Sequence, residues 1–150
     1  MTTSGQTNSI RAFGAGLGGS VIRRGETGYD DARRVWNGMI DKSPAAIIRC
    51  TSTADVVAAV NFAREENLVL AVRGGGHNAA GLGVCDDGVV IDLSGMRGVT
   101  VDAGQRIARV QGGALWRDVD AATHRHGLAT TGGLISSTGV GGLTLGGGLG

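Results

Sequence analysis

His77 follows three consecutive glycines, Gly74–Gly76, in the stretch "AVRGGGHNAAGLG", which covers residues 71–83. Glycine loses more conformational entropy on folding than any other residue, so such a run is costly and should have a use. Consecutive glycines allow several backbone N–H groups to point at one anion, as in a phosphate-binding nest. His77 itself could serve as a general base, a metal ligand or a covalent tether, and its spacing alone does not choose among these roles.

A second glycine-rich block covers residues 132–150 and carries no charged side chain. Either block alone could be a plain tight turn, but two of them behind strand-like runs favour a diphosphate held by neutral backbone amides. A third stretch, Gly14–Gly19, satisfies the G-x-G-x-x-G pattern. It lacks a preceding hydrophobic strand and a following helix, so we interpret it as a chance match and disfavour a nicotinamide-binding Rossmann domain.

The remaining histidines and the cysteines give weaker signals. His124 and His126 lie two residues apart on a predicted helix, so they point to different faces and cannot share a metal ion. No metal site is predicted. Cys50 ends an apolar run and Cys85 precedes a turn with no basic neighbour, which favours structural roles for both thiols.

Composition excludes several classes of protein. The chain has 150 residues, 41% of them apolar, with 29 glycines and a net charge of +1, which indicates one globular domain without an electrostatic case for nucleic acid. No apolar stretch approaches the roughly 20 residues of a membrane span. Two cysteines are too few for a disulfide framework, and the pair Arg23–Arg24 has no apolar run behind it as an export signal would. We therefore expect a cytoplasmic protein.

Periodicity predicts alternating strands and helices. Residues 1–20 read as a loose leader, followed by a short helix between residues 29 and 44. A β-α-β unit is expected over residues 45–76, with its helix capped by Ser52 and Asp55. Three further strands are predicted at 88–94, 98–103 and 106–113, then a helix at 114–127 and a glycine-rich loop region at 128–150. Trp36 and Trp116 are interpreted as packing residues.

Three strings carry a resemblance to a known family: "VRGGGHNAAGLGVCDDGVVIDLSGMRGVTVD", "ARVQGGALWRDVD" and "TTGGLISSTGVGGLTLGGGLG". Together they closely resemble the flavin domain of berberine bridge enzyme-like, or vanillyl-alcohol oxidase-type, FAD-linked oxidoreductases, from about Arg33 to Gly150. The resemblance implies an α+β, PCMH-type FAD-binding fold, with a first β-α-β subdomain over about residues 43–95 and the start of a second, mixed-sheet subdomain. Residues 1–41 are then a leader and short helix, and residues 42–150 an FAD-binding domain that is incomplete at its C-terminus.

The resemblance also implies how FAD is held. The family's R-G-G-G-H loop wraps the pyrophosphate, and its histidine, here His77, bonds covalently to the 8α-methyl of the isoalloxazine. Many members add a second tether through a cysteine, but Ile135 stands at that position, so only a single attachment is expected. The cofactor-binding residues implied by the family are Arg73, Gly74, Gly75, Gly76, His77, Asn78, Gly81, Gly132, Gly133, Ser136, Ser137, Gly139, Gly141 and Gly142.

The function implied by the family is oxidation of an alcohol or related small organic substrate by hydride transfer to the flavin. The family places its substrate domain and catalytic base after the glycine-rich run, so no catalytic residue is assigned here, and we expect these 150 residues to be the N-terminal portion of such an enzyme. A non-catalytic flavin-binding remnant is the alternative.

Overall fold

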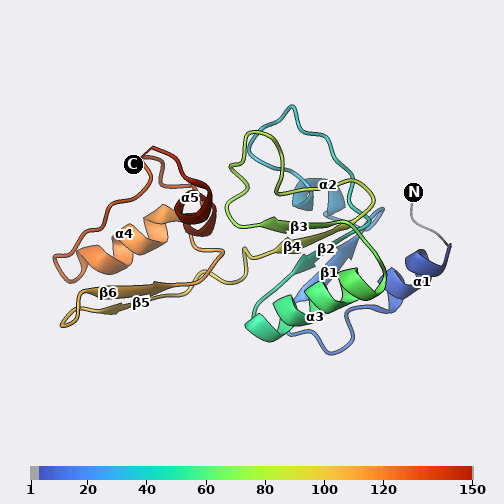
Figure 1. Cartoon of the computed structure of the whole chain (residues 1–150), viewed down its shortest axis with the longest axis horizontal. Coiled ribbons are helices and arrows are strands. Elements are labelled where there is room, and N and C mark those ends of the chain that lie inside the picture. The colour runs from blue at the N-terminus through green and yellow to red at the C-terminus, as the bar shows by residue number, and fades with distance from the viewer. Residues whose placement is uncertain (1–3, 150) are drawn as a thin grey trace.

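The computed structural model describes residues 4–149, which fold into two lobes (Figure 1). The first lobe holds a four-stranded sheet and three helices, and the second holds a two-stranded sheet and two helices. The elements of the first lobe are α1 (Ser4–Ala12), β1 (Ser20–Arg23), α2 (Tyr29–Ala32), β2 (Ala46–Arg49), α3 (Thr53–Glu65), β3 (Leu70–Arg73) and β4 (Val89–Asp92). Those of the second are β5 (Val99–Asp102), β6 (Ile107–Val110), α4 (Trp116–His124) and α5 (Val140–Gly146).

The sheet of the first lobe has the strand order β1-β2-β4-β3. The predicted β-α-β unit is present, but β2 and β3 do not pair with each other, because β4 inserts between them and runs parallel to both. β1 adds to the outer edge of β2 in the antiparallel sense. The register aligns Arg49, Asp92 and Arg73, so the three parallel strands all end in a charged residue at one edge.

The two central strands, β2 and β4, are buried on both faces, as their continuous apolar runs require, whereas the edge strand β3 leaves Leu70 and Val72 exposed. One face packs against α1 and α3 in a core that includes Ile48 and Ile91. The other face, with Ile47 and Val90, packs against α2 and the segment around Val84 and Cys85. Figure 1 shows α3 and α2 on opposite sides of the sheet. The sheet is therefore a rigid base for the loops at its carboxyl edge.

The α+β expectation is confirmed, and so are the strands at β4, β5 and β6. The helix predicted after Ser52 is also confirmed, with a capping box in which Ser52 Oγ accepts a hydrogen bond from Asp55 N. The helix predicted over 114–127 is confirmed as α4. The segment 29–44 is helical only over its first four residues, α2, and the loop predicted over 128–150 is wrong where α5 forms.

The expectation of a loose leader over residues 1–20 is wrong for the residues described. α1 buries Ile10 in the core of the first lobe. Arg23 of β1 donates to the carbonyl oxygens of Ile10, Arg11 and Phe13, which satisfies the C-terminal end of α1. α1 and β1 precede residue 42, yet both pack onto the same sheet as the residues that follow it. Residues 1–3 lie outside the described part.

The G-x-G-x-x-G match at Gly14–Gly19 lies between α1 and β1, so a helix precedes it and a strand follows it. This is the reverse of the strand–loop–helix order that a dinucleotide fingerprint needs. Gly18 N donates instead to the Asp55 carboxylate at the start of α3. The stretch connects two packed elements, in agreement with its interpretation as a chance match to the dinucleotide pattern.

Candidate flavin site

The two glycine-rich blocks meet backbone to backbone. The loop that leaves β3, residues 74–77, contacts the segment that enters α5, residues 136–139. A Cβ added to Gly75 would lie 2.7 Å from Gly139 Cα and closer still to Gly139 N. A Cβ on Gly139 would lie 2.9 Å from Gly75 Cα. Real Cβ atoms do not approach backbone this closely, so each glycine is required by the other, and the contact joins the two lobes.

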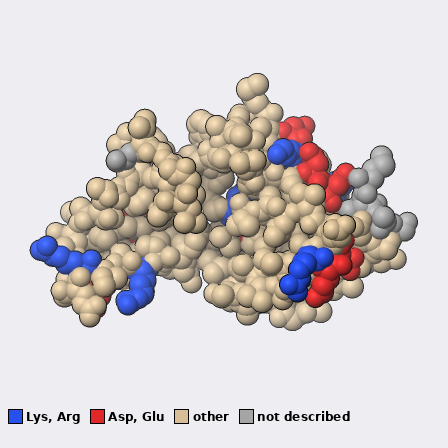
Figure 2. All heavy atoms as spheres, viewed as in Figure 1, with Lys and Arg blue, Asp and Glu red and all other residues tan. Residues whose placement is uncertain are grey.

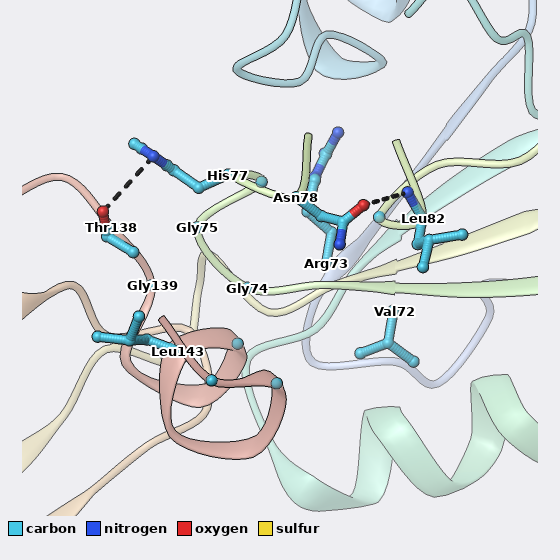
Figure 3. A pocket seen from close by; sticks show the side chains of 15 residues that line it. Val72, Arg73, Gly74, Gly75, His77, Asn78, Leu82, Thr138, Gly139 and Leu143 are labelled. Atoms are coloured by element: carbon cyan, nitrogen blue, oxygen red, sulfur yellow. Dashed lines mark hydrogen bonds between the residues drawn. The ribbon is translucent and has the colours of Figure 1, made fainter. Parts of the chain in front are cut away.

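A cleft of about 360 Å³ lies on one side of this junction (Figure 3). Its walls come from the end of β3, the 74–78 loop and the first turns of α5. The residues that border it include His77, Asn78, Thr138, Gly139 and Gly142. A Cβ on Gly142 would meet no atom within 4 Å, so this position faces open space. Figure 2 shows the hollow between the two lobes, with mostly uncharged residues around it.

A second cleft, of about 460 Å³, lies on the other side of the same loop. Gly74, Gly75, Gly76 and His77 border both clefts, while Trp36, Arg49 and Ser137 border only the second. The glycine loop is therefore a thin partition with a histidine at its end, and a ligand on either side would lie against its backbone.

The backbone N–H groups of this partition are available. Within the part of the chain that the structure describes, no group accepts a hydrogen bond from the N–H of Gly74, Gly75, Gly76 or His77. Gly76 has φ +70°, a left-handed conformation that side chains rarely adopt, and its carbonyl oxygen accepts from Trp36 N at 3.0 Å. Consecutive free amides on a glycine loop are the donors that hold an anionic diphosphate without a lysine.

The imidazole of His77 is held by two hydroxyl groups and one ring. Ser137 Oγ lies 3.3 Å from Nε2, and Thr138 Oγ1 lies 3.5 Å from Nδ1. Trp36 stacks on the imidazole, with ring centroids 5.6 Å apart and planes 18° from parallel. Figure 3 shows the side chain pointing away from Arg73 and toward Thr138. The histidine thus faces the segment that comes from the other lobe.

The Arg73 side chain forms a buried ion pair with Asp92. Its Nη2 lies 3.0 Å from Asp92 Oδ2, and both side chains are less than one-tenth exposed. Burial opposes ionisation of Asp92, but the Arg73 charge and a hydrogen bond from Ser94 N outweigh it and hold the pKa of this carboxyl below its ordinary value. Arg49 approaches the same oxygen from the other side, at 3.4 Å. The pair joins the carboxyl ends of β3 and β4 and fixes the start of the glycine loop.

The structure brings together most of the residues that the sequence singled out. Those that border one or both clefts are Arg73, Gly74, Gly75, Gly76, His77, Asn78, Ser137, Gly139 and Gly142. The others border neither cleft: Gly81 packs on Ile40, Gly132 and Gly133 lie against the Trp116 ring, Ser136 accepts a backbone hydrogen bond from Arg117, and Gly141 faces Gly112 O. These contacts, four by packing and one by a backbone hydrogen bond, join the segments that carry the site to their neighbours.

Two contacts of His77 escaped sequence reasoning. Trp36 was interpreted as a packing residue, which is correct for the buried Trp116 but wrong for Trp36, whose residue surface is 66% exposed. Thr138 received no role, although it follows Ser137 directly. The turn-forming pair Asn37–Gly38 directly after Trp36 was a local sign that Trp36 lies outside the core.

Some other kinds of site and segment are not found. Among residues 4–149 there is no group of three His, Cys, Asp or Glu side chains that could hold a metal ion. None of the helices described is both long and apolar enough to cross a membrane. Cys50 and Cys85 are buried and unpaired, and burial raises the pKa of both thiols, that of Cys50 to about 11.

Comparison with known proteins identifies a family for this chain. A family model described as an FAD binding domain matches residues 44–150. The FAD-linked oxidoreductase hasG of Aspergillus fumigatus is 41% identical over 133 residues, which is 89% of this chain and 28% of that protein. The crystal structure of 6-hydroxy-D-nicotine oxidase from Arthrobacter nicotinovorans has a TM-score of 0.84 at 33% identity, over 88% of this chain and 29% of that one.

A variant of the BBE-like 1 protein of Physcomitrella patens is similar over 96% of this chain and 31% of its own, with a TM-score of 0.83 and 26% identity. The chain thus spans less than a third of the length of these relatives. The free amides of the glycine partition and the open position at Gly142 fit the diphosphate-containing cofactor that the matched family binds. The chain therefore belongs to the berberine bridge enzyme-like family of FAD-linked oxidoreductases, and its cofactor is FAD.

Proposed function

We propose that FAD lies against the glycine partition, with its diphosphate on the amides of residues 74–77 and its ring bonded covalently to His77. The observation that carries this proposal is the row of unpaired N–H groups leading directly into a histidine that is oriented by contacts from both lobes.

Bound flavin supplies the chemistry, accepting a hydride from an alcohol or related small organic substrate. The chain's own part is to hold and orient the cofactor. The Arg73–Asp92 pair fixes where the loop begins, and the contact between Gly75 and Gly139 fixes how closely the second lobe approaches. Substrate class rests on the relatives, one of which is named as an oxidase of 6-hydroxy-D-nicotine, a small molecule.

Covalent attachment requires a neutral His77 imidazole with a free lone pair on one ring nitrogen. His77 would hold the isoalloxazine through a bond between a ring nitrogen and the 8α carbon, formed with loss of one hydrogen from the imidazole and one from the methyl group. Dioxygen would take up these two hydrogens as hydrogen peroxide. Ser137 and Thr138 are placed to accept or donate a proton at the two ring nitrogens.

The test is retention of flavin after denaturation. The protein loaded with FAD is precipitated with acid, and flavin absorbance is measured in the pellet and in the supernatant. We expect a yellow pellet from the wild type and complete release from His77→Ala, with His124→Ala on α4 as the control that keeps its flavin. Acid-stable flavin in His77→Ala, or a flavin-bearing peptide that contains Cys85, would overturn the assignment.

A further inference from the structure

Trp36 is the exposed aromatic residue that the function described so far does not use. Its residue surface is 66% exposed, yet its side chain has a definite partner, because it stacks on the His77 imidazole with an interplanar angle of 18°. A centroid separation of 5.6 Å lies within the range of offset stacked rings. Trp36 is not a member of either core cluster, and the stack on His77 is a definite contact of its side chain.

The backbone around Trp36 is fastened to the loop that carries His77. Trp36 N donates to Gly76 O at 3.0 Å, and Asn37 Nδ2 donates to Ala79 O at 2.8 Å, so the bonds flank the histidine. Arg73 Nη1 adds a third bond, to Arg34 O at 3.3 Å. The indole therefore sits on a segment that cannot move independently of the loop.

The clefts that Trp36 and His77 border show from which side the indole lies against the imidazole. Trp36 borders the second cleft and not the first, whereas His77 borders both. The indole covers one face of the imidazole from the side of the second cleft. The two hydroxyl contacts lie at the ring nitrogens, and the first cleft, with the open position at Gly142, stays accessible.

We propose that Trp36 is a positioning residue for flavin attachment, holding the His77 imidazole in the orientation in which its nitrogen bonds the flavin. This inference rests on the proposed covalent role of His77. Without the indole, the imidazole can rotate about its Cβ–Cγ bond and spends less time in the reactive orientation. A stacked pair of rings favours the stacked state by up to about tenfold, so that is the largest effect on rate that we expect.

The experiment separates rate from affinity. Apoprotein is mixed with FAD, reversible binding is measured by quenching of flavin fluorescence, and acid-stable flavin is followed over time. Trp36→Ala should form acid-stable flavin roughly three- to tenfold more slowly, with its reversible FAD affinity within about twofold of the wild type. Trp36→Phe, which keeps a flat ring, should recover most of the rate. Met39→Ala, at a 91% exposed position on the same segment, should match the wild type.

Each outcome has one meaning. Equal rates for Trp36→Ala and the wild type would overturn the role of Trp36 and leave attachment at His77 standing. A loss of FAD affinity or of thermal stability as large as the loss of rate would show a general structural role, and would also overturn it. Absence of acid-stable flavin in the wild type would overturn covalent attachment and this inference together. Proton NMR of the apoprotein provides a flavin-free check, because the His77 ring signals should lose their indole ring-current shift in Trp36→Ala.

Discussion

Two alanine substitutions at glycines that border the same cleft should have opposite effects. In Gly75→Ala, the new Cβ would lie 2.7 Å from Gly139 Cα, which forces the two loops apart. Overpacking of this kind costs about 1–3 kcal/mol. For a chain of this size each kcal/mol lowers the melting temperature by about 2–4 °C, so we expect a fall of roughly 2–12 °C.

Gly142→Ala is the matched variant. Its Cβ would meet nothing within 4 Å, and the position lies inside α5, where alanine is favoured over glycine by about 1 kcal/mol. The apoprotein should therefore be as stable as the wild type or slightly more so. The same methyl group projects into the cleft, and its overlap with a bound flavin should weaken FAD binding at least about tenfold, which corresponds to about 1.4 kcal/mol.

Differential scanning calorimetry of the apoproteins and fluorescence titration with FAD measure the two effects. Unchanged FAD affinity in Gly142→Ala would refute the placement of the cofactor in this cleft. An unchanged melting temperature in Gly75→Ala would refute the idea that the loop contact is rigid, since the lobes would then separate at no cost.

Three further predictions concern the scaffold. The Asp55 carboxyl accepts hydrogen bonds from the N–H groups of Thr51 and Gly18, which lower its pKa to about 2. Asp55 therefore stabilises the fold above its unfolded pKa of 3.8, and this stabilisation is lost as the pH falls toward 2. In urea unfolding, the difference in stability between the wild type and Asp55→Ala should disappear over that range. Asp92→Ala removes the ion-pair partner of the buried Arg73 guanidinium and should lower the free energy of unfolding by about 3–5 kcal/mol in the same assay. Burial raises the pKa of the Cys50 and Cys85 thiols, so iodoacetamide at pH 8 should label them in urea but not in the native protein, and rapid native labelling would contradict this.

Local patterns predicted the elements whose signals are local. Ser52 and Asp55 lie three residues apart, so the capping box of α3 can be found from spacing alone. The apolar run that becomes β4 predicted a strand, and the structure shows that this strand is buried along its whole length. The glycines that adjoin His77 in the chain also marked it as a candidate site residue, while its proposed role as a tether came from the family resemblance.

What could not be predicted depends on contacts between distant residues. α1 has a mostly polar sequence, and its end is satisfied by Arg23, a residue of the next strand, so no pattern within the segment marks a helix. Trp36 lies 41 residues before His77, and only the fold brings the two rings into a stack. The mutual requirement of Gly75 and Gly139 is similar, because each glycine looks ordinary until the loops meet.

The strand order of the first lobe has a consequence for synthesis on the ribosome. β4 is the last of the four strands to be made, yet it lies between β2 and β3, which cannot pair with each other. Until residue 92 has left the exit tunnel, the nascent chain carries two unpaired strand edges of the kind that promote aggregation. β4 also supplies Asp92, the ion-pair partner of Arg73. The start of the glycine loop is therefore held in place only after β4 has joined the sheet. On the placement of FAD proposed above, a nascent chain arrested before β4 should not retain flavin, and it should need chaperone protection.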